Sequence, residues 1–170
     1  MRPAVFTAVL LLVGIISTVT EVSAVHPWEI CTKLKGSACD EPGWIRFGGS
    51  RCMKYFRVEK NFKQAEESCH SMDSELLSIH NEDENNHAMC LSYYSLSPSH
   101  KRSFWIEGKK SGDVFKFKDG SELEYTNWHT GEPNNVKQLH TCIQSNFRQW
   151  GKWNDFGCHW KNDFVCMKRK

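Results

Sequence analysis

Two short polar strings near the C-terminal end of the chain hold the residues best suited to bind a ligand. Glu132 and Asn134 flank Pro133, and Asn154 and Asp155 follow farther along. Carboxylate and amide oxygens are what a hard cation such as calcium prefers, in shells of about six to eight oxygens. The same groups can hydrogen-bond sugar hydroxyls. One carboxylate and one amide in each string therefore predict a site for calcium and carbohydrate.

Either string alone would be an ordinary structural feature. Pro and Asn are common turn residues, so residues 132–134 in isolation would indicate an exposed turn. Trp153, directly before Asn154, would indicate a core tryptophan beside a turn. The interpretation as a site depends on both strings occurring in order, around Cys142 and just ahead of Cys158.

Composition argues against several other functions. The net charge is +2, and the only basic run is the tail Lys168-Arg169-Lys170, so no electrostatic footprint for nucleic acid is present. The chain has no Gly-x-Ser-x-Gly, no His-Glu-x-x-His and no phosphate-binding glycine loop. No Cys-x-x-Cys pair supports a zinc site. We therefore expect neither an enzyme nor a nucleic-acid-binding protein.

The first 24 residues have the pattern of a secretory signal peptide. Arg2 precedes an apolar run over residues 4–16, and small residues occupy 22–24. The run is shorter than the roughly 20 residues needed to span a bilayer. We predict a secreted, extracellular protein with no membrane insertion, in which residues 25–170 form one domain.

Hydrophobic periodicity predicts two helices that precede a long half of strands and loops. Short strands are expected at 45–47 and 52–56, around a turn at Gly48-Gly49. Phe62, Ala65 and Cys69 have helical spacing within a predicted helix over 60–72. A second helix should begin after residues 78–81 and run to about residue 93, followed by a loop and a buried strand at 104–106. This order indicates the α+β class.

From residue 39 to residue 166 the chain resembles C-type lectin domains. Trp105-Ile106-Glu107-Gly108 is similar to the core strand of that family. Residues 117–121 with Trp128 are similar to the segment that leads into its sugar loop. The resemblance implies a C-type lectin-like α+β fold, in which two helices pack on antiparallel sheets beside a long sugar-binding loop and disulfides stabilise the whole. The predicted lectin domain is 39–170, after an N-terminal arm at 25–38.

All eight cysteines follow the predicted signal peptide and should be oxidised in a secreted chain, but spacing alone allows 105 pairings. The family resemblance implies three bridges: Cys39–Cys52, Cys69–Cys166 and Cys142–Cys158. It leaves Cys31 and Cys90, which could pair within the chain or with another copy. Because Cys31 lies in the N-terminal arm, ahead of the first bridge, we favour an interchain link and a disulfide-linked homodimer.

The resemblance also assigns the site. It implies calcium ligands at Glu132, Asn134, Asn154 and Asp155, which also bind the sugar, and a cis bond before Pro133. His140 stands where the family commonly has a further acidic ligand. An imidazole lacks that charge and suits zinc or copper better than calcium, so we expect weak or no calcium binding. His140 would then hydrogen-bond a sugar hydroxyl.

The predicted function is a secreted lectin that recognises surface glycans and agglutinates microbes or cells, similar to the small single-domain defence lectins of fish. Both mannose-type and galactose- or lactose-type glycans fit. An aromatic face for a sugar could come from Trp150, Trp153, His159 and Trp160, although Trp153 is better explained as core. The alternatives are a calcium-dependent mannose-type lectin and a lectin-like protein-binding domain. An ice-binding protein ranks lower because threonines are scattered.

Overall fold

A computed structural model describes residues 26–34, 36–46, 50–95 and 102–169. The predicted signal peptide and the Gly48-Gly49 turn lie outside the described residues. Within these ranges, no helix has the length and hydrophobicity needed to cross a membrane.

The described chain forms three α-helices, a 3-10 helix and nine strands. Their order is α1 (Pro27–Lys33), β1 (Ser37–Ala38), β2 (Ile45–Arg46), β3 (Arg51–Lys60), α2 (Phe62–His70), β4 (Glu75–Leu76), α3 (Glu82–Ser95), β5 (Phe104–Ser111), β6 (Val114–Lys116), η1 (Val136–Gln138), β7 (His140–Ser145), β8 (Asn154–Gly157) and β9 (Asn162–Arg169).

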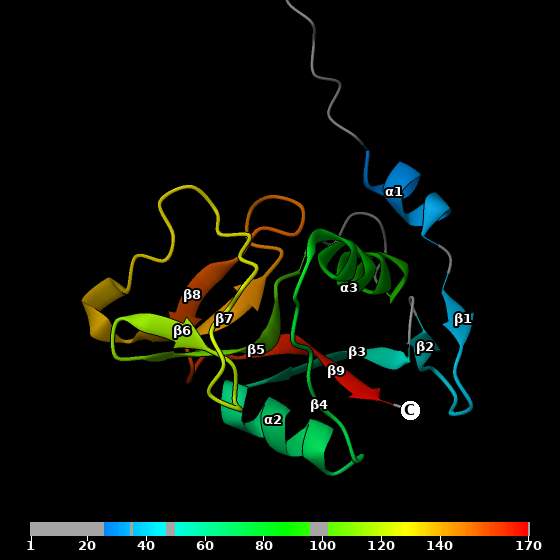
Figure 1. Cartoon of the computed structure of the whole chain (residues 1–170), viewed down its shortest axis with the longest axis horizontal. Helices are drawn as coiled ribbons and strands as arrows, with labels where there is room; N and C mark the ends of the chain where they lie inside the picture. The colour runs from blue at the N-terminus through cyan, green and yellow to red at the C-terminus, as the bar shows by residue number, and fades with distance from the viewer. Residues whose placement is uncertain (1–25, 35, 47–49, 96–101, 170) are drawn as a thin grey trace, which may run out of the picture.

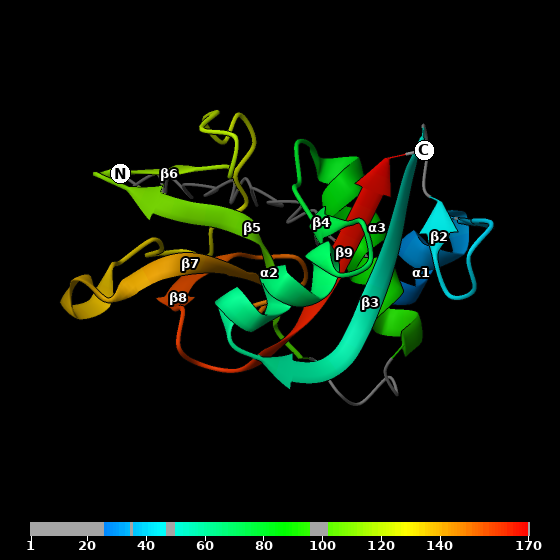
Figure 2. The same ribbon diagram turned by 90° about the horizontal axis from the view of Figure 1, so that it is seen from below.

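The strands join in one sheet in the order β1-β2-β3-β9-β5-β7-β8, while β4 also pairs with β9 and β6 with β5. All pairs are antiparallel except β5 with β9. Helices α2 and α3 lie on opposite sides of the β3–β9 pair (Figure 1). Strands β7 and β8 lie side by side at the end of the molecule away from α1 and β2 (Figure 2). The polar strings therefore lie far from the N-terminal arm.

Side-chain alternation along the central strands builds a core on each face of the sheet. In β9, Phe164 and Cys166 pack toward α2, whereas Val165 and Met167 pack toward α3. Successive strand residues point to opposite faces, so a strand covered on both sides must be apolar almost throughout. This explains the unbroken apolar run from Phe164 to Met167 in the middle of β9.

The predicted helices are present with nearly the expected limits. Phe62, Ala65 and Cys69 are the buried residues of α2, as their spacing predicted. Asn61 caps this helix in a reciprocal capping box with Gln64. At the start of α3 the Asn81 side chain accepts a hydrogen bond from the Glu84 amide at 2.9 Å. Both helix starts therefore follow from local sequence.

Four disulfides lie within the chain: Cys39–Cys52, Cys69–Cys166, Cys142–Cys158 and Cys31–Cys90. The first three are those implied by the family resemblance. The fourth corrects the prediction of an interchain link through Cys31. Cys31 is 1% exposed and bonded to Cys90 on α3, so all eight cysteines are paired within one chain.

The N-terminal arm is held against α3. Its helix α1 was not predicted from the sequence, although Pro27 at its first turn is a favourable start. Besides the Cys31–Cys90 bridge, the hydroxyl of Tyr94 donates a hydrogen bond to the carbonyl of Cys31 at 2.9 Å. Helix α1 is therefore fixed to α3 by one covalent bond and one hydrogen bond.

Candidate functional site

The segment carrying Glu132 and Asn134 is a long loop attached at its base to the start of β8. The Trp153 amide donates to the Asn127 carbonyl and the His129 amide to the Trp153 carbonyl, each at 2.8 Å. Trp153 is 1% exposed, which confirms it as a core residue. The base of the loop is therefore hydrogen-bonded to the backbone of the buried Trp153, directly before Asn154.

A tight turn presents the first polar string. Gly131 has a φ of +86°, a conformation that favours glycine, and the Glu132 amide donates to the His129 carbonyl at 2.9 Å. The peptide bond between Glu132 and Pro133 is cis. Asn134 is exposed, and its side-chain oxygen accepts from the Val136 amide at 3.2 Å.

Asp155 joins the two polar strings. Its Oδ1 accepts a hydrogen bond from the Asn134 amide at 2.9 Å, and its Oδ2 accepts one from the Asn135 amide at 2.6 Å. Asp155 is fully buried and the neighbouring Asn154 is 4% exposed. Hydrogen bonds to a charged acceptor are stronger than neutral ones. The Asp155 carboxylate therefore anchors the turn that follows Pro133.

The carboxyl group of Glu132 lies beside that of Asp155. Burial raises the pKa of Glu132, and a hydrogen bond and charge repulsion from Asp155 raise it further. Oxygen Oε2 of Glu132 is buried and has no hydrogen-bond partner. Two adjacent acids with one unpartnered oxygen form an arrangement that a proton or a cation would stabilise.

His140 lies at the start of β7, opposite Gly157 of β8. Its ring lies against Phe156, with centroids 5.6 Å apart, and its Nδ1 is buried without a partner. With the Asn135 amide oriented to suit its neighbours, its nitrogen donates to the His140 carbonyl at 3.2 Å. The backbone of His140 thus borders the loop while its ring packs on Phe156. Its role in sugar binding stays a prediction.

His129 is a neighbour of the site that residue types and spacing did not indicate. The charge of its imidazole lowers the pKa of Glu132 and so partly opposes the effect of burial and of Asp155. Its ring also packs edge-on against Phe147 at 5.5 Å. The only sequence signal was its position three residues before Glu132, within the same turn.

The donors suit calcium by type but provide little charge. Glu132, Asn134, Asn154 and Asp155 offer side-chain oxygens, the atoms that calcium prefers. Only two of these side chains can carry a negative charge. Across the described residues, no three side chains of His, Cys, Asp or Glu form a group able to hold a metal. The four residues therefore match calcium in donor type, with at most two negative charges among them.

Most of the described chain matches a known domain family. The family described as the Lectin C-type domain matches residues 58–168. This chain belongs to the C-type lectin family. The predicted α+β C-type lectin-like fold is thereby confirmed, with α1 as an additional helix. C-type lectin domains are binding modules, and the chain is not an enzyme.

Individual relatives agree with this assignment. The lectin is 33% identical over 140 residues to "C-type isolectin Sp-CL4" of Scorpaena plumieri, covering 82% of this chain and 95% of that relative. It is 34% identical over 140 residues to "Galactose-specific lectin nattectin" of Thalassophryne nattereri, covering 81% and 84%. The solved mouse scavenger receptor C-type lectin carbohydrate-recognition domain superposes with a TM-score of 0.66 at 27% identity, covering 78% of this chain and 99% of that one.

The four aromatic residues considered for a sugar face lie in three places. Trp153 is in the core. Trp150 donates from its indole to Asn86 at 3.3 Å and packs near Tyr93. Trp160 is 54% exposed and has His159 beside it, with ring centroids 5.1 Å apart. The lectin therefore has no single aromatic face made by all four residues.

Proposed function

We propose that this lectin is a secreted carbohydrate-binding protein whose site comprises Glu132, Asn134, Asn154 and Asp155. The observation that carries the proposal is the position of the Asp155 carboxylate. It accepts hydrogen bonds from the backbone amides of Asn134 and Asn135 and lies beside the Glu132 carboxyl group. Carboxylates and amides so placed can hydrogen-bond vicinal hydroxyls of a sugar. Family membership and a relative named as a galactose-specific lectin support the same ligand class.

Calcium has a limited part in this proposal. The four residues would be its ligands, and a bound ion would neutralise the adjacent carboxyl groups and orient sugar hydroxyls. Ligand charge sets calcium affinity, and the protein supplies only two carboxylates here. Because the pKa of Glu132 is raised, protons compete with the ion at higher pH than for an ordinary glutamate. We expect weak calcium binding that decreases as pH falls.

The sugar class is a terminal hexose of the mannose or galactose type. The Glu-Pro-Asn string resembles that of mannose-type family members, whereas one relative carries galactose in its name. Inhibition by mannose and by lactose, measured in parallel on the same immobilised glycan, assigns one of the two.

The test is a glycan array probed with the secreted protein in calcium and in EDTA. Glu132→Gln keeps the size of the side chain but removes its charge, and should reduce glycan binding at least about tenfold. Glu124→Gln is the matched control, because Glu124 is an exposed glutamate of the same loop. Folded wild-type protein that binds no glycan in either condition would refute the proposal and favour the protein-binding alternative. Complete loss of glycan binding in EDTA would show that binding requires calcium.

Secretion and agglutination complete the proposal. Residues 1–24 have a signal-peptide pattern, and four disulfides are typical of an oxidising compartment. Agglutination requires at least two sites in one particle. With every cysteine paired inside the chain, we propose that two copies associate without a covalent link. One experiment tests both secretion and agglutination. Culture medium from cells that express the protein should agglutinate glycan-bearing cells.

A further inference from the structure

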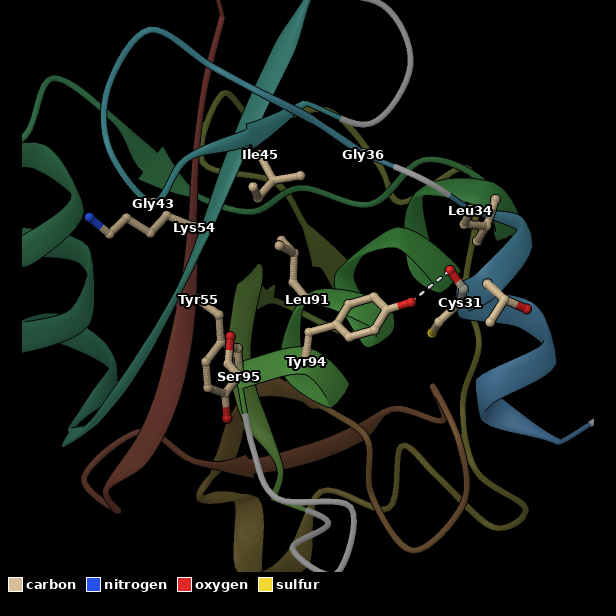
Figure 3. Close-up of a pocket in the computed structure, with 11 residues that line it drawn as sticks. Cys31, Leu34, Gly36, Gly43, Ile45, Lys54, Tyr55, Leu91, Tyr94 and Ser95 are labelled. Carbon is tan, nitrogen blue, oxygen red and sulfur yellow. Dashed lines mark hydrogen bonds between the residues drawn. The ribbon is translucent and has the colours of Figure 1, made fainter.

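A second concave site lies far from the polar strings, between the N-terminal arm and the sheet. Its volume is about 830 Å³, within the range of about 300 to 1,000 Å³ common for small-molecule sites. Figure 3 shows α1 on one side, Ile45 above, and the end of α3 with Leu91 and Tyr94 in the middle. Most of the described lining precedes residue 58, where the family match begins.

The surface of the cavity is mainly apolar, and the two tyrosine hydroxyls among its lining residues already have partners. Leu34, Ile45 and Leu91 supply aliphatic surface. The Tyr94 hydroxyl donates to the Cys31 carbonyl at 2.9 Å, and the Tyr55 hydroxyl donates to Asp163 at 2.7 Å. A ligand would therefore gain mainly from burying apolar area, at about 25 cal/mol per Å².

The described lining has one charged side chain, and its charge is directed elsewhere. The ammonium of Lys54 donates to the Pro42 carbonyl at 3.1 Å and lies 5.6 Å from the centroid of Phe56. In Figure 3 the Lys54 side chain runs past Gly43, away from Leu91 and Tyr94. A charged ligand would lose hydration here without gaining a counter-ion, which disfavours it.

The rim argues for a small molecule over a protein partner. Among the described large hydrophobic residues that are exposed, Tyr94 is the only one that lines this cavity. Stable protein interfaces bury about 1,200 to 2,000 Å² of surface in total. A single exposed large hydrophobic residue in the described lining provides far less apolar surface than such an interface needs. Because Cys31 is bonded to Cys90, the wall formed by α1 is present before any ligand binds.

We propose that this cavity, bounded by α1, β2, β3 and α3, binds a small uncharged apolar molecule with an aromatic or alkyl body. This site is separate from the carbohydrate site and does not depend on the proposed function.

The test uses N-phenyl-1-naphthylamine, a neutral dye that fluoresces in apolar surroundings, and its sulfonated analogue 8-anilino-1-naphthalenesulfonate. Folded wild-type protein should bind the neutral dye with one site, and the anionic dye at least about fivefold more weakly. Excitation beyond the absorption of tryptophan keeps protein fluorescence out of the signal. No binding of the neutral dye would overturn the proposal, and equal or tighter binding of the anion would overturn the choice of an uncharged ligand.

Variants locate the binding. Ser95→Trp and Thr32→Trp add bulk at two lining residues, one on α3 and one on α1, so each should weaken binding of the neutral dye at least about tenfold. Glu67→Trp, on the exposed surface of α2, is the matched control and should bind normally. Binding that persists in both filling variants would refute the site. Glu132→Gln should leave dye binding unchanged. Light scattering is run alongside, and a dimer that the dye dissociates would show that a second copy occupies the cavity instead.

Discussion

At the residue scale, the site depends on a carboxyl pair that is unfavourable in the free protein. Burial and Asp155 raise the pKa of Glu132, so the folded state holds the Glu132 proton more tightly than the unfolded state does. Such a group favours folding while it is protonated. That contribution is lost as pH rises through the raised pKa.

Glu132→Gln should therefore stabilise the protein at neutral pH without calcium while reducing glycan binding. The amide nitrogen of Gln can donate to Asp155, where the wild type has a second carboxyl group. We expect a rise in Tm of about 1 to 3 °C at pH 7.5 in EDTA, which shrinks as pH falls toward 4. Thermal unfolding across this pH range tests it, with Glu124→Gln as control. A gain that is equal at all pH values would contradict the electrostatic explanation.

The residue types of the site could be predicted from sequence, but the environment of His140 could not. Glu132, Asn134, Asn154 and Asp155 are recognisable as oxygen donors in two ordered strings. The β7–β8 ladder shifts register between His140 and Cys142, and a register shift changes which face a side chain occupies. Such a shift leaves no signature in residue spacing. The ring of His140 lies against Phe156, a contact the sequence did not indicate.

At the scale of elements, helices α2 and α3 were predictable because their buried residues repeat at helical spacing and their starts carry capping side chains. Helix α1 has only seven residues, and isolated helices shorter than about 12 residues are marginal in water. Tertiary contacts with α3 must therefore stabilise it. The sequence alone therefore does not predict this helix, and nothing in the residue spacing places Cys31 beside Cys90.

Removing the Cys31–Cys90 bridge should release the arm and leave the carbohydrate site intact. The double variant Cys31→Ser/Cys90→Ser opens a loop of 59 residues, for which the chain-entropy model gives up to about 4 kcal/mol. Urea unfolding gives the free-energy change, and trypsin should cleave sooner after Lys33. Glycan binding, measured in parallel, should stay at the wild-type level. Unchanged stability with a protected arm would contradict the role assigned to this bridge.

At the scale of the whole molecule, four internal disulfides define one covalent unit per chain. On a non-reducing gel the wild-type protein should migrate as a monomer, because no cysteine is left to join a second chain. Under reducing conditions it should still be a monomer, with lower mobility as the compact bridged form opens. A dimer band that disappears with reductant would contradict the intrachain pairing of Cys31.

The internal pairing of Cys31 has a consequence for how the lectin would act on a surface. Copies that associate without a covalent link obey mass action, so their valency changes with concentration. When dilute, a glycan-binding chain of this kind would cover individual glycans without joining particles. Above the dissociation constant of the assembly, the same molecules would cross-link them. Local accumulation of the protein, more than the affinity of one site, would then set the threshold for clumping.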